Sequence, residues 1–71
     1  MDRKVIIDTG NQKQLFKVRE YDGRFTVYRI NVGFFTDDSR KIGETRSLED
    51  AITLIKTSVD GSVRNVEIKN W

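Results

Sequence analysis

The chain has 71 residues, of which 13 are Lys or Arg and 11 are Asp or Glu, giving a formal net charge of +2. A chain of this length has room for one hydrophobic core, so we expect a single domain spanning residues 1–71. It has no cysteine and no histidine, which excludes disulfides, the usual tetrahedral zinc ligand sets and the commonest nucleophilic and acid–base mechanisms. The small net charge also excludes a histone-like binder, so any electrostatic function must depend on where the charges lie.

The first apolar run is Val5-Ile6-Ile7, which predicts a short strand or a segment laid on the sheet, followed by a polar turn over residues 8–11. The run is too short for a signal-peptide core or for a membrane span. We therefore expect a cytoplasmic protein that has no membrane partner.

A β-hairpin is the clearest local signal. Asp22-Gly23 separates two β-rich runs, residues 15–21 and 24–30, and suits a two-residue type I′ turn, in which both central residues need φ > 0. Such a turn sets the register of the strands. The expected pairs are Tyr21 with Arg24, Glu20 with Phe25, Arg19 with Thr26, Val18 with Val27, Lys17 with Tyr28, and Phe16 with Arg29.

This register divides the hairpin into two faces. The face expected to meet the core is apolar and carries Phe16, Val18, Phe25 and Val27. The other face is basic and aromatic and carries Lys17, Arg19, Tyr21, Arg24, Thr26 and Tyr28.

Strict alternation after the hairpin would bring three apolar residues onto the basic face: Ile30, Val32 and Phe34. Two explanations remain open. Either a β-bulge within residues 31–33 switches the facing, or both faces are partly covered, for instance by a second subunit. We favour the bulge because Gly33 suits one.

Asp37-Asp38-Ser39 is expected to form the next turn, which leads into a strand over residues 40–45 with Ile42 pointing inward. Adjacent carboxylates in a turn could form a weak divalent-cation site, but oxygen-ligand loops normally supply more ligands at wider spacing. We therefore expect no metal and no cofactor.

One helix is predicted to begin after Ser47, whose hydroxyl can cap the Asp50 amide, and to end at Asp60-Gly61. These two residues could equally form the turn into the next strand. An apolar stripe that can lie across a sheet comprises Leu48, Ala51, Ile52, Ile55 and Val59, with Leu54 off the stripe.

A last strand is predicted over residues 63–71, with Val66 and Ile68 inward and Glu67, Lys69 and Trp71 outward. We expect Trp71 to pack on the edge of the domain and fasten this strand; an exposed Trp71 would instead anchor a contact.

The basic and aromatic face is the constellation to which we assign a possible ligand. Cations on a sheet can neutralise phosphates while bases stack on the rings, as in several single-strand binders. The candidate ligand-binding residues are Lys17, Arg19, Tyr21, Arg24 and Tyr28, with Arg29 as a further phosphate contact.

Two other readings of this face stay open. Antiparallel sheets often keep one face solvated with these residue types, and nearby acidic residues weaken its field: Glu20, Asp22 and Glu44. Alternatively, the face mediates self-association, with an apolar centre of Leu15, Tyr28 and Ile30.

Residues 40–51, RKIGETRSLEDA, resemble the strand-to-helix junction of small DNA-binding modules built from three antiparallel strands and a helix, such as plant AP2-type domains and the arm-binding domains of phage integrases. The resemblance implies a sheet that packs against a helix. The chain departs from it by adding a strand after the helix and by lacking a tryptophan on the strands that read DNA, so no functional residue is carried over.

Together these patterns predict an α+β domain with an antiparallel sheet of three to five strands and one helix packed on one face, in the order (β)βββαβ. We expect a non-enzymatic binding module whose partner is nucleic acid. The alternative is a protein–protein interaction or regulatory subunit that forms a homodimer through its sheet.

Overall fold

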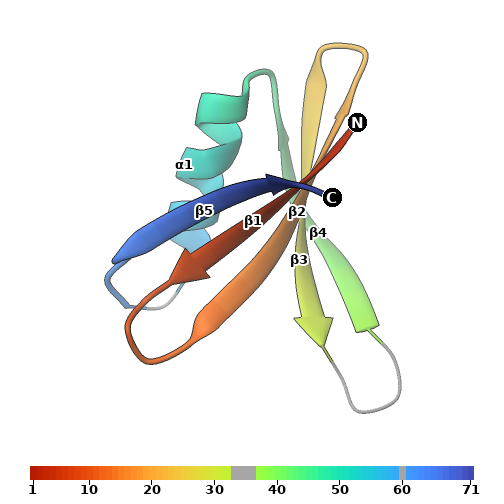
Figure 1. The fold of residues 1–71 in the computed structure, drawn as a ribbon. Coiled ribbons are helices and arrows are strands. Elements are labelled where there is room, and N and C mark those ends of the chain that lie inside the picture. The colour runs from red at the N-terminus through yellow and green to blue at the C-terminus, as the bar shows by residue number, and fades with distance from the viewer. Residues whose placement is uncertain (33–36, 60) are drawn as a thin grey trace.

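The fold is one antiparallel sheet of five strands with a helix on one face (Figure 1). The computed structural model describes residues 1–32, 37–59 and 61–71. In chain order the elements are β1 (Asp2–Asp8), β2 (Lys13–Tyr21), β3 (Arg24–Val32), β4 (Asp37–Thr45), α1 (Leu48–Ser58) and β5 (Asn65–Asn70). Across the sheet the strands follow the order β4-β3-β2-β1-β5. The predicted α+β class and element order are confirmed.

The first strand is an inner strand of the sheet. β1 pairs with β2 on one side and with β5 on the other. Val5 and Ile7 are fully buried in the core, whereas Ile6 between them points to the opposite face and is half-buried. The short apolar run at residues 5–7 is therefore a strand, and it joins the two ends of the chain into one sheet.

The hairpin of β2 and β3 has the predicted register throughout. Asp22 and Gly23 adopt φ values of 53° and 75°, as a type I′ turn requires. All six predicted pairs are present, and a further pair joins Leu15 to Ile30. The local turn chemistry was sufficient to set this pairing.

The bulge lies elsewhere than predicted. The register shift occurs where β3 passes from Val27 to Tyr28, opposite Gly43 and Lys41, so Ile42 is the extra residue on β4. β3 pairs regularly with β4 as far as Val32, and Ile30 stays on the same face as Tyr28. The predicted bulge at residues 31–33 is thus wrong up to Val32, while Gly33 and Phe34 lie outside the described residues.

The observed bulge has a packing reason. It lets Ile42 pack against the core, as expected, while Lys41 remains opposite Tyr28 on the other face. The helix also approaches β4 closely, because a Cβ on Gly43 would lie only 2.6 Å from Leu54 Cδ2. The turn predicted at Asp37-Asp38-Ser39 is wrong, because these residues already belong to β4.

The helix begins as predicted, with the Asp50 amide donating to Ser47 Oγ at 3.0 Å. Ala51 and Ile55 are buried, and Leu54, which the apolar stripe left out, also packs against the core. The helix ends at Ser58, before the predicted end, because Val59 is already extended. Gly61 has the expected positive φ of 93°, and Asp60 lies outside the described residues.

The core fills the space between the sheet and α1. Its buried members are Val5, Ile7, Phe16, Val18, Val27, Ala51, Ile55 and Val59. Val66 packs against it from β5, as predicted, but Ile68 is 47% exposed. Ile68 pairs with the buried Val5 and so points to the same side, but the helix lies over β3 and β4 and leaves this part of the edge strand uncovered. Among the described residues, no helix has the length and apolar character needed to cross a membrane.

Candidate nucleic-acid interface

The sheet face opposite α1, here called the open face, carries a line of four lysines and one tyrosine that crosses all five strands. Residues paired across antiparallel strands share a face, so the pairing places Lys69, Lys4, Lys17, Tyr28 and Lys41 side by side, from β5 to β4. We call this set the lysine row. It gathers lysines from both ends of the chain and from its middle.

The five candidate residues predicted from the sequence all lie on the open face. Lys17 and Tyr28 are members of the lysine row, Arg19 pairs with Thr26 beside it, and Tyr21 pairs with Arg24 at the hairpin end. Tyr21 is 79% exposed, whereas Tyr28 is half-buried. The side chains that sequence analysis grouped on one face are therefore together in space.

A small hollow lies within this group. It has a volume of about 120 Å³ and is lined by Lys17, Arg19, Tyr28 and Ser39. That volume admits an anion or a few water molecules. Three of its four lining residues belong to the predicted set, and no lining residue is acidic.

Asp2 reduces the positive charge at the centre of the open face. Arg19 Nε donates to Asp2 Oδ1 at 3.2 Å, and Lys17 Nζ lies 3.4 Å from Asp2 Oδ2. The hydrogen bond from Arg19 lowers the pKa of the Asp2 carboxyl below its ordinary value, and the charge of Lys17 adds to this effect. The same hydrogen bond raises the pKa of the Arg19 guanidinium. Sequence analysis missed this neutralisation, since Asp2 meets the hairpin only through the pairing of β1 with β2.

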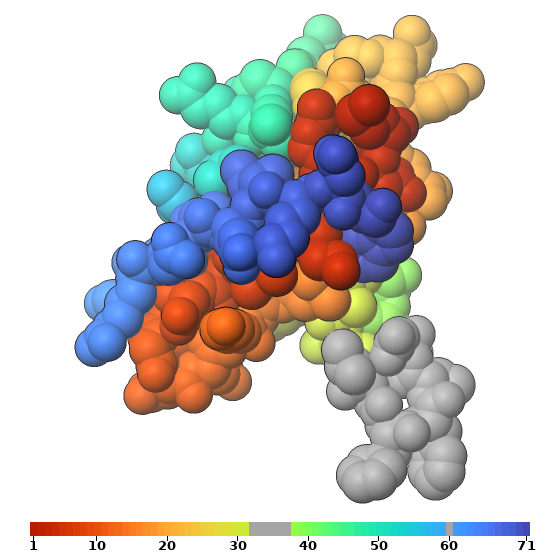
Figure 2. Space-filling model, in the orientation of Figure 1, coloured from red at the N-terminus to blue at the C-terminus, as the bar shows by residue number. Residues whose placement is uncertain are grey.

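Trp71 lies over the lysine row. Lys4 Nζ is 5.3 Å and Lys17 Nζ is 5.1 Å from the centre of its ring, within the range of cation–π contacts. Its backbone amide donates to the Asp2 carbonyl at 3.1 Å, which holds the end of the chain against β1. Figure 2 shows this C-terminal segment, in dark blue, lying against the N-terminal segment, in red. Trp71 thus fastens the last strand, as expected, and remains 53% exposed.

A second line of side chains runs beside the lysine row. It contains Ile6, Leu15 and Ile30, which are paired across β1, β2 and β3 and are all half-buried. We call these three residues the apolar row. Glu67 and Ser39 continue the line at its two ends. The open face therefore presents a cationic line and an apolar line in parallel.

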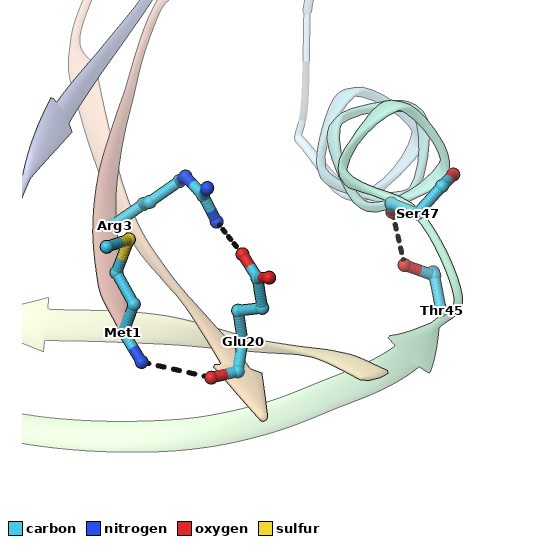
Figure 3. Close-up of polar contacts among 5 residues, drawn as sticks. All are labelled: Met1, Arg3, Glu20, Thr45 and Ser47. Carbon is cyan, nitrogen blue, oxygen red and sulfur yellow. Dashed lines mark hydrogen bonds and ion pairs between the residues drawn. The ribbon is translucent and has the colours of Figure 1, made fainter. Parts of the chain in front are cut away.

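The helix side of the sheet accounts for two residues that were expected to affect this surface. Glu20 binds Arg3 at 2.7 Å there and accepts a bond from the Met1 amine through its carbonyl (Figure 3), so it does not weaken the open face. Arg29 pairs with the buried Phe16 and donates to Gln14 Oε1 at 2.6 Å. Arg29 is therefore not a phosphate contact on the open face, and that expectation is wrong.

Acidic residues also share the open face: Asp2, Asp8, Glu44 and Glu67. Within the part of the chain that the structure describes, no group of three or more Asp or Glu residues could hold a metal ion. Comparison with protein-family models, curated proteins and solved structures finds no match for this chain. The chemistry of the open face is thus the basis for assigning a function.

Proposed function

We propose that this chain is a non-enzymatic, cytoplasmic module that binds nucleic acid through its open face. The observation that carries the proposal is the lysine row, in which Lys69, Lys4, Lys17 and Lys41 line up across the sheet with Tyr28 among them. Neighbouring strands are about 4.8 Å apart, so Lys69, Lys4 and Lys17 form a cationic track on three adjacent strands, and Tyr28 separates them from Lys41. Within this track Lys69 Nζ lies 3.3 Å from Glu67 Oε1.

The predicted ligand-binding residues have distinct roles in this proposal. Lys17, Arg19 and Arg24 neutralise phosphates, while the rings of Tyr21 and Tyr28 stack on bases. The lysines contribute chiefly as point charges on flexible stems, which suits contacts to a phosphate backbone more than reading of base edges. The module would therefore bind with little sequence preference and with strong dependence on salt.

The test is binding of a labelled oligonucleotide over a series of salt concentrations, comparing Lys41→Ala with Lys56→Ala. Both lysines are exposed and both changes remove one positive charge, but Lys41 lies on the open face and Lys56 on the helix. Each phosphate contact adds about 0.7 to 0.9 to the slope of log affinity against log salt. Lys41→Ala should weaken binding and reduce that slope, whereas Lys56→Ala should change neither. Equal effects of the two variants, or no binding by the wild-type chain at low salt, would reject the proposal.

The apolar row supports a second candidate function, a protein–protein interaction or regulatory subunit that forms a homodimer through the open face. Leu15 and Ile30 adjoin Tyr28, and buried apolar centres with charged rims are common in dimer interfaces. Light scattering separates the two candidates when combined with Leu15→Lys. A dimeric mass that falls to the monomer value in this variant, together with no oligonucleotide binding, would favour the dimer.

A further inference from the structure

We infer that the nucleic acid bound by the open face is single-stranded and that Trp71 is its principal base-stacking residue. This inference rests on the proposed function. The inference goes beyond the proposed function by naming the form of the nucleic acid and by adding Trp71, which was not among the candidate ligand-binding residues.

The width of the face argues against a duplex. The lysine row spans all five strands, which at about 4.8 Å per step is about 19 Å from β5 to β4. The major groove of B-DNA is about 12 Å wide and admits a helix or a two-stranded ribbon. The helix α1 lies on the other face of the sheet. The sheet is therefore too wide to enter the groove and reach base edges there, whereas an extended single strand can lie along the row from β5 to β4 with its bases accessible.

The two parallel lines of side chains fit the two sides of a single strand. The apolar row lies two residues along the strands from the lysine row, a separation of about 6.7 Å. With phosphates along the lysine row, bases turned to one side would cover the half-buried surface of Ile6, Leu15 and Ile30, while other bases stack on the aromatic rings in and beside the row. A duplex keeps its bases stacked inside and cannot offer them to this line.

Trp71 is positioned to hold a base over the middle of the track, beside Lys4 and Lys17. The ammonium groups of Lys4 and Lys17 lie over its ring at 5.3 and 5.1 Å, and they belong to neighbouring strands of the sheet beneath it. These contacts orient the ring while leaving the side chain 53% exposed. A base stacked on the exposed part of the ring would bring its phosphate close to the same two lysines. Trp71 therefore joins a stacking surface to the cationic track.

The experiment measures binding of oligothymidylate of about ten nucleotides and of a duplex of the same length, at the same salt concentrations. Trp71 is the only tryptophan, so its intrinsic fluorescence reports directly on this position. We expect tighter binding of the single strand, with quenching of Trp71 fluorescence. Loss of one base–aromatic stack weakens binding by about 5- to 150-fold, so Trp71→Ala should lie in that range and Trp71→Phe should retain most of the affinity.

The outcomes distinguish a failure of this inference from a failure of the proposed function. If neither oligonucleotide binds at low salt, the proposed function fails and the inference fails with it. If the duplex binds at least as tightly as the single strand, the proposed function stands and the single-strand inference is overturned. If the single strand binds without changing the fluorescence of wild-type Trp71, the role of Trp71 is overturned, whatever Trp71→Ala does to the fold.

Discussion

Asp2 offers the sharpest electrostatic test of the open face. Its carboxylate lies 3.2 Å from Arg19 Nε and 3.4 Å from Lys17 Nζ, so it occupies two cations that would otherwise meet phosphates. Asp2→Asn should release both. If each gains a phosphate on a single strand, the slope of log affinity against log salt becomes steeper by up to about 1.4. Each exposed ion pair gained is worth about 0.2 to 1 kcal/mol, so affinity should rise several-fold.

Glu20→Gln is the matched control. It removes the same charge, but from the helix side, where Glu20 binds Arg3 at 2.7 Å (Figure 3). The assay is fluorescence anisotropy of a labelled oligonucleotide over a salt series, with circular dichroism to confirm folding. Asp2→Asn should tighten binding more than Glu20→Gln. Equal gains would mean that only net charge matters, and a loss of affinity in folded Asp2→Asn would refute the placement of phosphates beside Lys17 and Arg19.

Three further predictions concern stability. The folded-state pKa of Asp2 is lowered, so the stability contributed by its ion pairs is present above its unfolded pKa of about 4 and is lost as the pH falls through the folded value. Acid unfolding curves should show this loss in the wild-type chain and not in Asp2→Asn. Identical curves for the two proteins would contradict the prediction. Phe16→Ala should lower the free energy of unfolding, measured by urea titration, by about 3–5 kcal/mol because Phe16 is fully buried. A loss of less than about 1 kcal/mol would count against the described core. Ser47→Ala should cost about 1 kcal/mol by removing the cap on the Asp50 amide, and Ser47→Asp should restore most of it; equal stability of the two variants would argue against the cap.

Features of the fold that depend on neighbouring residues in the chain were predictable. The positive φ values of Asp22 and Gly23 formed the turn that set the pairing of β2 with β3. The side-chain period of two then placed Lys17 and Tyr28 on one face. The start of α1 followed from the Ser47 cap in the same way. These signals are local because hydrogen bonds within a turn or a helix end join residues only a few positions apart.

The complete binding surface depended on contacts between distant parts of the chain. Alternation shows which residues share a face of a strand, but it does not show which strands are neighbours. Only the tertiary structure placed β1 between β2 and β5, and this arrangement brought Lys4 and Lys69 beside Lys17, set Asp2 against Arg19 and laid Trp71 over the row. The bulge at Ile42 also belongs to the tertiary structure, because it lets Ile42 pack against the core. The sequence by itself determined the element types and the hairpin register through local hydrogen bonding, whereas the packing of the whole chain decided which charges meet on the open face.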